Sequence, residues 1–200
     1  MNLFRATLMR TLAVLLLGGA SHAYSAGPKA WVRLTDCQYV AQVYNDGDSF
    51  HVRCGADELI VRLYFVDAPE ASFQNPERVR EQSEYFGVTL DETLRAGKQA
   101  TVTVKEMLQT PFVVWTRWAN AMGRTRIPRY YAFVEAGTQS LADLLVSKGL
   151  ARIKGITAKS PLGVPSQTTL EKLRALEHDA QQQRRGVWAT SSGGATQSSP

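Results

Sequence analysis

Residues 46–70 read DGDSFHVRCGADELIVRLYFVDAPE, and this stretch is the most informative part of the chain for the fold. Apolar and β-branched residues alternate with polar ones over 49–54 and 58–66, which predicts two β-strands, and residues 38–45 predict another before them. The Asp46-Gly47 pair and residues 55–57 provide the turns. We therefore predict a three-stranded meander with acidic residues at its turns.

The remaining pattern extends this meander into a barrel. Residues 75–108 have a helical pattern interrupted at Gly87 and Gly97, and we expect an extra helix within this long connection. Residues 112–118 and 130–135 predict two more strands. A helix between the third and fourth of five strands is typical of an OB-type barrel. The predicted fold class is α+β, a five-stranded antiparallel OB-type β-barrel with three or more helices packed on it.

Two helices are predicted after the barrel. Ser140 is a suitable cap with an acidic residue three positions later, and Gly149 is a natural stop. The last helix is expected to begin with a cap at Thr168-Thr169-Leu170-Glu171. Its apolar stripe, which we expect to pack on the core, comprises Leu170, Leu173, Leu176 and Ala180.

The N-terminal residues resemble an export signal. Arg5 and Arg10 precede the short apolar run 12–17, and small residues follow, with cleavage predicted after Ala23. The run is too short to span a membrane comfortably. We therefore divide the chain into a signal peptide (1–23), a short N-terminal arm (24–31), one OB-fold domain (32–188) and a disordered polar tail (189–200). The predicted location is periplasmic or secreted.

The charge of the chain suits a polyanionic partner without requiring one. The 200 residues carry a formal net charge of +5, and the predicted signal contains two of the arginines and no acidic residue. A mild excess of positive charge therefore remains after processing.

Cys37 and Cys54 are the two cysteines of the chain. They lie on opposite sides of the Asp46-Gly47 turn at nearly equal distances, so a hairpin would bring them together. An oxidising compartment then favours a disulfide, and two buried thiols are the alternative. A zinc site is not supported, because His51 and His178 have no partners at ligand spacing.

Three acidic residues and one arginine at these strand ends indicate a specific chemistry. Asp48, Asp67 and the backbone carbonyl of Ala68 offer the oxygen ligands that Ca²⁺ prefers. Glu70 can orient or deprotonate a water, and Arg62 can contact two phosphate oxygens at once. Acids this close would otherwise repel one another and raise their pKa values. The combination indicates metal-assisted hydrolysis of a phosphodiester.

Each motif also has an ordinary structural explanation. Asp-Gly is a common hairpin turn, Asp67-Ala68-Pro69-Glu70 could be a strand-end turn before a helix, and Arg62 could be a solvated strand residue. Their occurrence together favours the catalytic interpretation.

These motifs resemble the staphylococcal nuclease, or thermonuclease, family over about residues 32–188. The resemblance rests on the Asp-Gly-Asp-Ser turn, Arg62, the Val-Asp-Ala-Pro-Glu run, Gly149-Leu150-Ala151-Arg152 and Gly186-Val187-Trp188. It implies that Asp48 and Asp67 hold calcium, that Arg62 binds phosphate and that Glu70 acts on the water. Where the family often has threonine the chain has Ala68, which keeps the carbonyl and loses a hydroxyl.

The resemblance also implies a second catalytic arginine, for which two positions remain open. Arg124 follows a glycine as in the family, whereas Arg129 keeps the spacing to the next strand. Either could neutralise the charge that grows in the transition state. Alternatively, the segment is a basic guide for a polyanion, made up of Arg117, Arg124, Arg126 and Arg129.

The positions that stack on bases in the family differ here. The family's lysine and tyrosine before Gly-Arg fall on Ala121 and Met122, and its later aromatic residues fall near Gly155 and Thr157. Other aromatic residues are either stacking platforms or part of the core: Trp115, Trp118, Tyr130 and Tyr131.

We therefore expect a secreted or periplasmic Ca²⁺-dependent endonuclease that hydrolyses DNA or RNA. Phosphate contacts carry no sequence information, so low sequence specificity is expected. The expected partner is the nucleic acid, with no stable protein partner, no membrane contact after processing, and a monomeric state. The alternative is a non-catalytic OB-fold nucleic-acid-binding module, against which the retained acids Asp48, Asp67 and Glu70 argue.

Overall fold

The computed structural model describes residues 29–122 and 126–191. The predicted signal peptide, Arg124 and most of the predicted polar tail lie outside the described residues, and they stay predictions.

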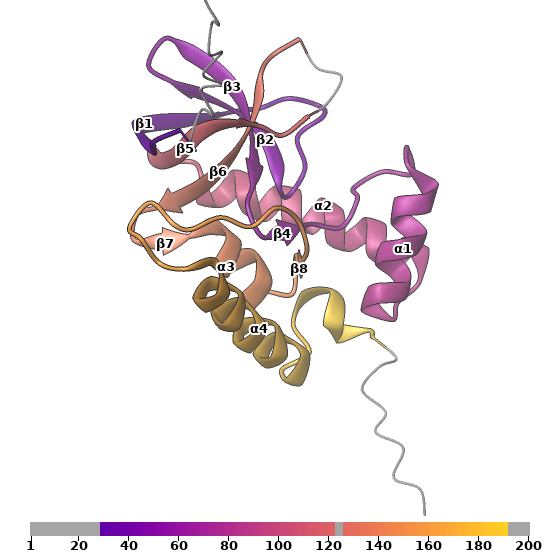
Figure 1. Ribbon diagram of the computed structural model, residues 1–200. Helices are drawn as coiled ribbons and strands as arrows, with labels where there is room; N and C mark the ends of the chain where they lie inside the picture. Colours follow the sequence, from indigo (N-terminus) through magenta and orange to yellow (C-terminus); the bar gives the residue numbers. More distant parts are fainter. Residues whose placement is uncertain (1–28, 123–125, 192–200) are drawn as a thin grey trace, which may run out of the picture.

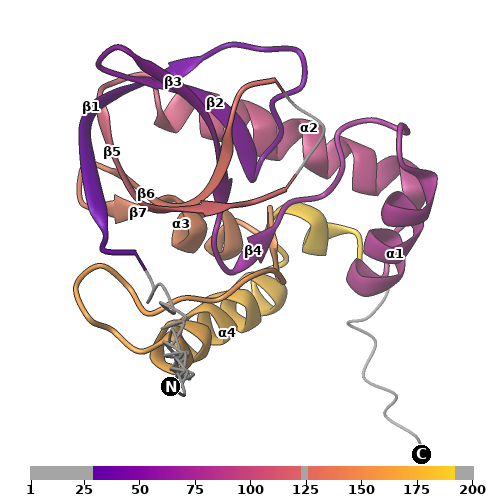
Figure 2. The ribbon, with the colours of Figure 1, turned by 45° about the horizontal axis from the view of Figure 1, so that its top comes forward.

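Five strands form a closed ring (Figure 2). They are β1 (Val32–Val40), β2 (Ser49–Cys54), β3 (Asp57–Leu63), β5 (Phe112–Asn120) and β6 (Arg129–Ala136). Their order is β3-β2-β1-β5-β6, and β6 pairs back onto β3. The predicted α+β class and OB-type barrel are confirmed. The closing β3–β6 pair is parallel, because a ring with an odd number of strands cannot alternate in direction throughout.

Short strands complete the sheets. The two-residue strands β4 (Val66–Asp67) and β8 (Arg152–Ile153) pair antiparallel, which places Asp67 opposite Arg152. The strand β7 (Gln139–Ser140) continues the barrel sheet beyond β6. Strand β4 follows shortly after β3. Asp67 therefore lies at the end of the barrel, where it meets strand β8 from the last third of the chain.

Within the described residues, four α-helices and one 3-10 helix lie mainly below and to the right of the barrel in the view of Figure 1. They are α1 (Pro76–Phe86), α2 (Leu90–Met107), α3 (Leu141–Ser147), α4 (Ser166–Gln182) and η1 (Gly186–Ala189). The expected extra helix is present, since Gly87 ends α1 with a left-handed backbone and Thr89 starts α2 with a capping box. In the described ranges, no helix is both long enough and apolar enough to cross a membrane.

The predicted bounds of two elements are wrong. Strand β1 spans Val32–Val40 instead of 38–45, because residues 41–48 form the loop that carries the acidic turn. Helix α4 begins at Ser166, after Pro165, and no side chain caps it. The predicted cap at Thr168 is therefore an error: a proline at the helix start needs no N–H partner, and it opened the helix earlier. The predicted stripe does pack on the core.

The core fills the barrel and continues under α2, α3 and α4. Alternate residues of β2 and β3 point inward, among them Phe50, Val52, Val61 and Leu63, all at most 1% exposed. The residues between them therefore lie on the other face of the strands. That face carries Arg62.

Two glycines let the loops of the barrel rest on α2. A Cβ at Gly97 would lie 2.3 Å from the carbonyl oxygen of Glu70, and one at Gly47 would lie 2.6 Å from the Cβ of Ala100. Helix α2 runs through Gly97 without a break, and the glycine that weakened the helical pattern allows the close contact between α2 and the backbone of Glu70. This contact fixes where the Asp-Ala-Pro-Glu segment lies.

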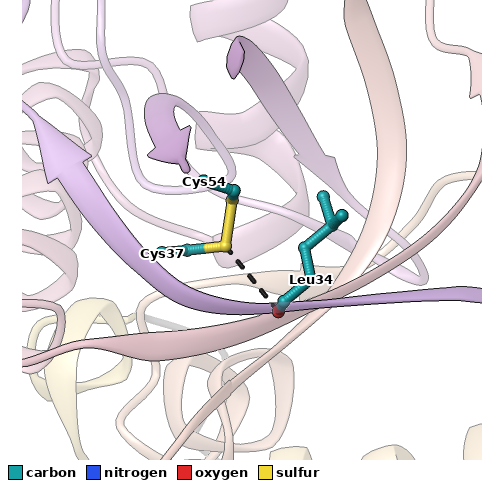
Figure 3. The surroundings of a disulfide bond; sticks show 3 residues. All are labelled: Leu34, Cys37 and Cys54. Carbon is teal, nitrogen blue, oxygen red and sulfur yellow. Dashed lines mark hydrogen bonds between the residues drawn. A yellow bond between two sulfur atoms is a disulfide. The ribbon is translucent and has the colours of Figure 1, made fainter. Parts of the chain in front are cut away.

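A disulfide joins Cys37 of β1 to Cys54 of β2, with their Cα atoms 4.2 Å apart (Figure 3). It continues the β1–β2 pairing, in which Gln38 lies opposite Arg53. The sulfur of Cys37 lies 3.7 Å from the carbonyl oxygen of Leu34. A disulfide sulfur has no proton, so this is a packing contact and not a hydrogen bond.

We expect removal of the disulfide to lower the free energy of unfolding by about 3 kcal/mol, the value for a loop of about 15 residues. The cysteines are separated by 17 positions. The measurement is urea unfolding of the oxidised protein and of the Cys37→Ser/Cys54→Ser protein. An unchanged unfolding midpoint would contradict a stabilising role.

Candidate active site

Asp48, Arg62 and Asp67 come together at one end of the barrel. Arg62 Nη1 lies 2.7 Å from Asp48 Oδ1, and its Nη2 lies 2.9 Å from Asp67 Oδ1. Arg62 reaches both because it pairs with Ser49 across β2 and β3, next to Asp48, while Asp67 follows in β4. One guanidinium therefore bridges the two predicted metal ligands.

Asp48 is held by its own turn and is 2% exposed. Asp46 Oδ1 accepts hydrogen bonds from the backbone N–H groups of Asp48 and Ser49, at 3.1 and 2.6 Å. Asp48 Oδ2 accepts from the N–H of Ala68 at 2.9 Å. Burial raises the pKa of Asp48 well above its ordinary value, and the charge of Asp46 adds to the rise, whereas Arg62 opposes it.

Asp67 is also 2% exposed, and it is surrounded by positive charge. Its Oδ1 accepts from Arg62 and from Arg78 Nη2 at 2.8 Å, and its Oδ2 accepts from Arg152 Nε at 2.8 Å. Burial alone would raise the pKa of Asp67, but the hydrogen bond and charge of Arg78, with Arg152 and Gln82, lower it to about 2. Asp67 is therefore ionised at neutral pH.

Glu70 lies at the edge of this network and is partly open to solvent, with 24% of its side chain exposed. Its Oε1 accepts from Arg78 Nε at 2.6 Å. Its backbone is fixed by a hydrogen bond from its N–H to Gln82 Oε1 at 2.8 Å. Glu70 is the most exposed of the three acids, so its carboxylate can contact a water molecule.

Gln82 is a site residue that the sequence interpretation missed. It lies on α1 with no exposed surface. Its Nε2 donates to Asp67 Oδ2 at 3.1 Å and to the carbonyl oxygen of Ala68 at 2.9 Å. The signal was present, since Gln82 falls on the buried stripe of α1 with Val79 and Phe86, where a polar side chain needs partners.

Arg152 was missed as well, although the Gly-Leu-Ala-Arg motif contains it. It is 2% exposed, and its guanidinium lies over the ring of Tyr85 at 5.3 Å. Its Nη2 lies 3.2 Å from Glu81 Oε2 without forming a hydrogen bond. Glu81 also pairs with Lys154 at the surface. Arg152 therefore links α1 to Asp67, which lies 85 positions before Arg152 in the sequence.

Of the two candidates for the second arginine, the structure describes Arg129. It begins β6 and lies opposite Ile60, two residues from Arg62 on β3. Burial lowers the pKa of Arg129, and the nearby positive charge of Arg62 lowers it further. Its Nη1 donates to the carbonyl oxygen of Met122 at 3.3 Å, and its buried Nε has no hydrogen-bond partner among the described residues. Arg129 thus faces the same end of the barrel as Arg62.

The four aromatic residues considered for base stacking are all partly buried. Trp118 packs edge-on against Tyr130 at 5.1 Å, and Tyr131 lies 5.2 Å from Tyr64. Trp115 donates to Glu135 Oε2 at 3.3 Å. In the structure these four aromatic side chains therefore contact other side chains of the protein.

The donor set fits a calcium ion in its chemistry. Asp48 and Asp67 supply carboxylate oxygens, and Ala68 supplies the carbonyl beside them. The two carboxylates share one guanidinium, each contacting a different terminal nitrogen of Arg62. Within the described ranges, no three His, Cys, Asp or Glu side chains gather into a metal-binding group. The fit therefore rests on two side chains and one carbonyl.

The fold and site together define an OB-type barrel with paired acids and arginines at one end. The family model of the staphylococcal nuclease homologues matches residues 60–190, and the chain belongs to this family. The family indicates a nuclease or nucleic-acid-binding function. No curated protein matched the chain.

Proposed function

We propose that this protein is an exported, calcium-dependent nuclease that hydrolyses phosphodiester bonds of DNA or RNA with low sequence specificity. The observation that supports it best is the single guanidinium of Arg62, which contacts Asp48 and Asp67 at 2.7 and 2.9 Å in the network whose edge carries the partly exposed carboxylate of Glu70. Acids that share one cation, next to a solvent-accessible base, suit attack by water on a bound phosphate.

Glu70 is the proposed general base. Its carboxylate accepts the proton of the attacking water, the bond from phosphorus to the leaving oxygen breaks as the bond to the water oxygen forms, and the leaving oxygen takes a proton from solvent. Arg78 contacts Glu70 at 2.6 Å and orients the carboxylate. Gln82 and the contact with Gly97 hold the backbone of Glu70 in place.

Arg62 and Arg129 are the proposed phosphate contacts. Both lie on the same face of β3 and β6, and 17% of the Arg62 side chain is exposed. A guanidinium can exchange one oxygen pair for another, so Arg62 can leave the acids for the phosphate when another cation neutralises them. Arg129 adds a second charge for the transition state. Arg124 is the other candidate for this role.

Asp48, Asp67 and the carbonyl of Ala68 are the proposed ligands of Ca²⁺, which would supply charge neutralisation at the phosphate oxygens. Gln82 holds both Asp67 and Ala68 through the same amide nitrogen. The two ligands on that loop are therefore positioned together.

Export is proposed from the predicted signal segment and from the disulfide, since disulfides persist in oxidising compartments.

The direct test is digestion of plasmid DNA and of RNA by the purified protein, with calcium and with a chelator. We expect cleavage of both polymers that requires calcium, and loss of cleavage in the Asp48→Asn variant. Binding without cleavage in calcium would reject the nuclease and favour the non-catalytic module.

We expect the Arg62→Lys variant to lose about 10²-fold or more in kcat/KM, the range for one preorganised donor to a charged transition state. Lysine keeps the charge but cannot make the planar two-pronged contact. The matched control is Arg53→Lys, because Arg53 lies on the neighbouring strand with 53% of its side chain exposed. Equal kinetics for the Arg62→Lys variant and the wild type would remove Arg62 from the mechanism.

A further inference from the structure

A hollow of about 620 Å³ opens beside Arg129. Its walls include Tyr44, His51, Ile60, Ile127, Arg126 and Arg129. Small-molecule sites commonly enclose about 300–1,000 Å³, so the hollow has a suitable size for part of a nucleotide. None of the catalytic roles above uses Tyr44 or His51.

The strand register connects this hollow to the phosphate-binding arginines. His51 of β2 lies opposite Ile60 of β3, and Ile60 lies opposite Arg129 of β6. Arg62 lies two residues beyond Ile60 on β3. Residues two apart on a strand share one face of the sheet, so Ile60 and Arg62 lie on the same face. His51, Ile60 and Arg129 therefore form a row next to Arg62, and Asp67 lies beyond the C-terminal end of β3.

Tyr44 gives the hollow an aromatic surface at its mouth. Its side chain is exposed (78% for the residue), although large aromatic rings are usually buried. Apolar Ile60 and Ile127 form part of the walls, and Arg126 and Arg129 bring positive charge. An exposed ring next to cations is the arrangement that binds a base and its phosphate together.

His51 is held in a defined orientation within this wall. Asn45, only 7% exposed, accepts from the backbone N–H of His51 at 3.0 Å, and its Oδ1 lies 2.7 Å from His51 Nδ1. The Asn45 amide nitrogen in turn donates to Val40 O at 2.8 Å. Because Asn45 Oδ1 is an acceptor, His51 Nδ1 carries the proton and Nε2 is the acceptor of the ring. An acceptor of this kind suits the N–H groups of a base.

We propose that this hollow binds the base of the nucleotide next to the phosphate held by Arg62 and Arg129, with the base stacked on Tyr44. The inference rests on the proposed function for the identity of the ligand. It also offers this chain a stacking surface on a different segment from Gly155 and Thr157, near which the resemblance predicts aromatic residues and the sequence has none.

The test measures binding without cleavage. Fluorescence anisotropy in chelator gives the Kd of an eight-nucleotide oligo(dT) and of an eight-unit abasic strand with the same phosphates. Tyr44→Ala should weaken binding of oligo(dT) about tenfold and leave binding of the abasic strand unchanged, as expected for loss of one stacked base. Tyr44→Phe should bind as the wild type does. Val43→Ala, at an exposed position (87%) outside the lining of the hollow, is the control.

The outcomes separate this proposal from the nuclease assignment. Equal effects of Tyr44→Ala on the two strands, or no effect on either, would overturn the base site even if the protein cuts DNA. A selective loss for oligo(dT) would support the base site even if no cleavage occurs with calcium. Failure of the wild type to bind either strand would overturn the base site, and the digestion with calcium tests the nuclease separately.

Discussion

Replacing Glu70 with Gln lowers kcat by about 10²–10⁴-fold if this residue is the base, which is the usual contribution of general acid–base catalysis. The amide keeps the size of the side chain and can still accept from Arg78, but it cannot take the proton of water. The backbone hydrogen bond from Glu70 to Gln82 is unaffected. We therefore expect nucleic-acid binding to be retained or slightly strengthened, because one negative charge is removed near a polyanion.

The control for this change is Glu77→Gln. Glu77 is an exposed acid in the first turn of α1, so it carries the same charge change near the site without contact to the other acids. Single-turnover kinetics at saturating substrate, with anisotropy for binding, separates the chemical step from affinity. Unchanged turnover in the Glu70→Gln variant would exclude Glu70 as the base.

Replacing Arg152 with Met is expected to lower the free energy of unfolding by about 3 kcal/mol, the low end for removing one partner of a buried ion pair. Asp67 would keep Arg62 and Arg78, which limits the loss. The contact over the ring of Tyr85 would also be lost. Urea unfolding at neutral pH measures the difference.

The pH dependence of this difference identifies its cause. The pKa of Asp67 is about 2 in the folded protein, below its ordinary value of about 3.9, so its charge stabilises the fold above about pH 4 and this stabilisation is lost as the pH falls toward 2. Without Arg152 the pKa of Asp67 rises, and less stabilisation remains to be lost. The gap between wild type and variant should therefore shrink between about pH 4 and pH 2. A constant gap would assign the effect to packing.

Lys154→Met is the matched control for Arg152. Lys154 pairs with the same Glu81, but half of its side chain is exposed. Exposed ion pairs contribute at most about 1 kcal/mol, so this variant should unfold close to the wild type. A loss as large as that of Arg152→Met would show that Glu81, and not Asp67, is the important partner.

The strands of the barrel were predictable because each has an alternating pattern of apolar and polar residues within its own sequence. Strand β2 matches its predicted span of 49–54, since its alternating residues face the core and the solvent in turn. Ser140 caps α3 as expected, through a hydrogen bond from the N–H of Asp143. The convergence of Asp48, Arg62 and Asp67 was also predictable, because all three lie within one meander.

Contacts between distant segments were not predictable in the same way. Arg152 reaches Asp67 only because β8 pairs with β4, and no local pattern encodes the pairing of two-residue strands. Arg78 and Gln82 enter the site because α1 folds back over the Asp-Ala-Pro-Glu segment. The start of α4 was misplaced because the Thr-Thr-Leu-Glu signal outweighed the proline before it.

The parallel pairing of β3 with β6 has a consequence for how activity arises during folding. Asp48, Arg62 and Asp67 belong to a contiguous stretch and can meet early, whereas Arg129 joins them only when the two ends of the sheet meet. A slip of one residue in that pairing would turn Arg129 toward the apolar interior. Closure of the barrel and the arrival of Arg129 beside Arg62 are thus a single event, so a partly folded chain would hold the acids and lack one of the two arginines that we propose as phosphate contacts.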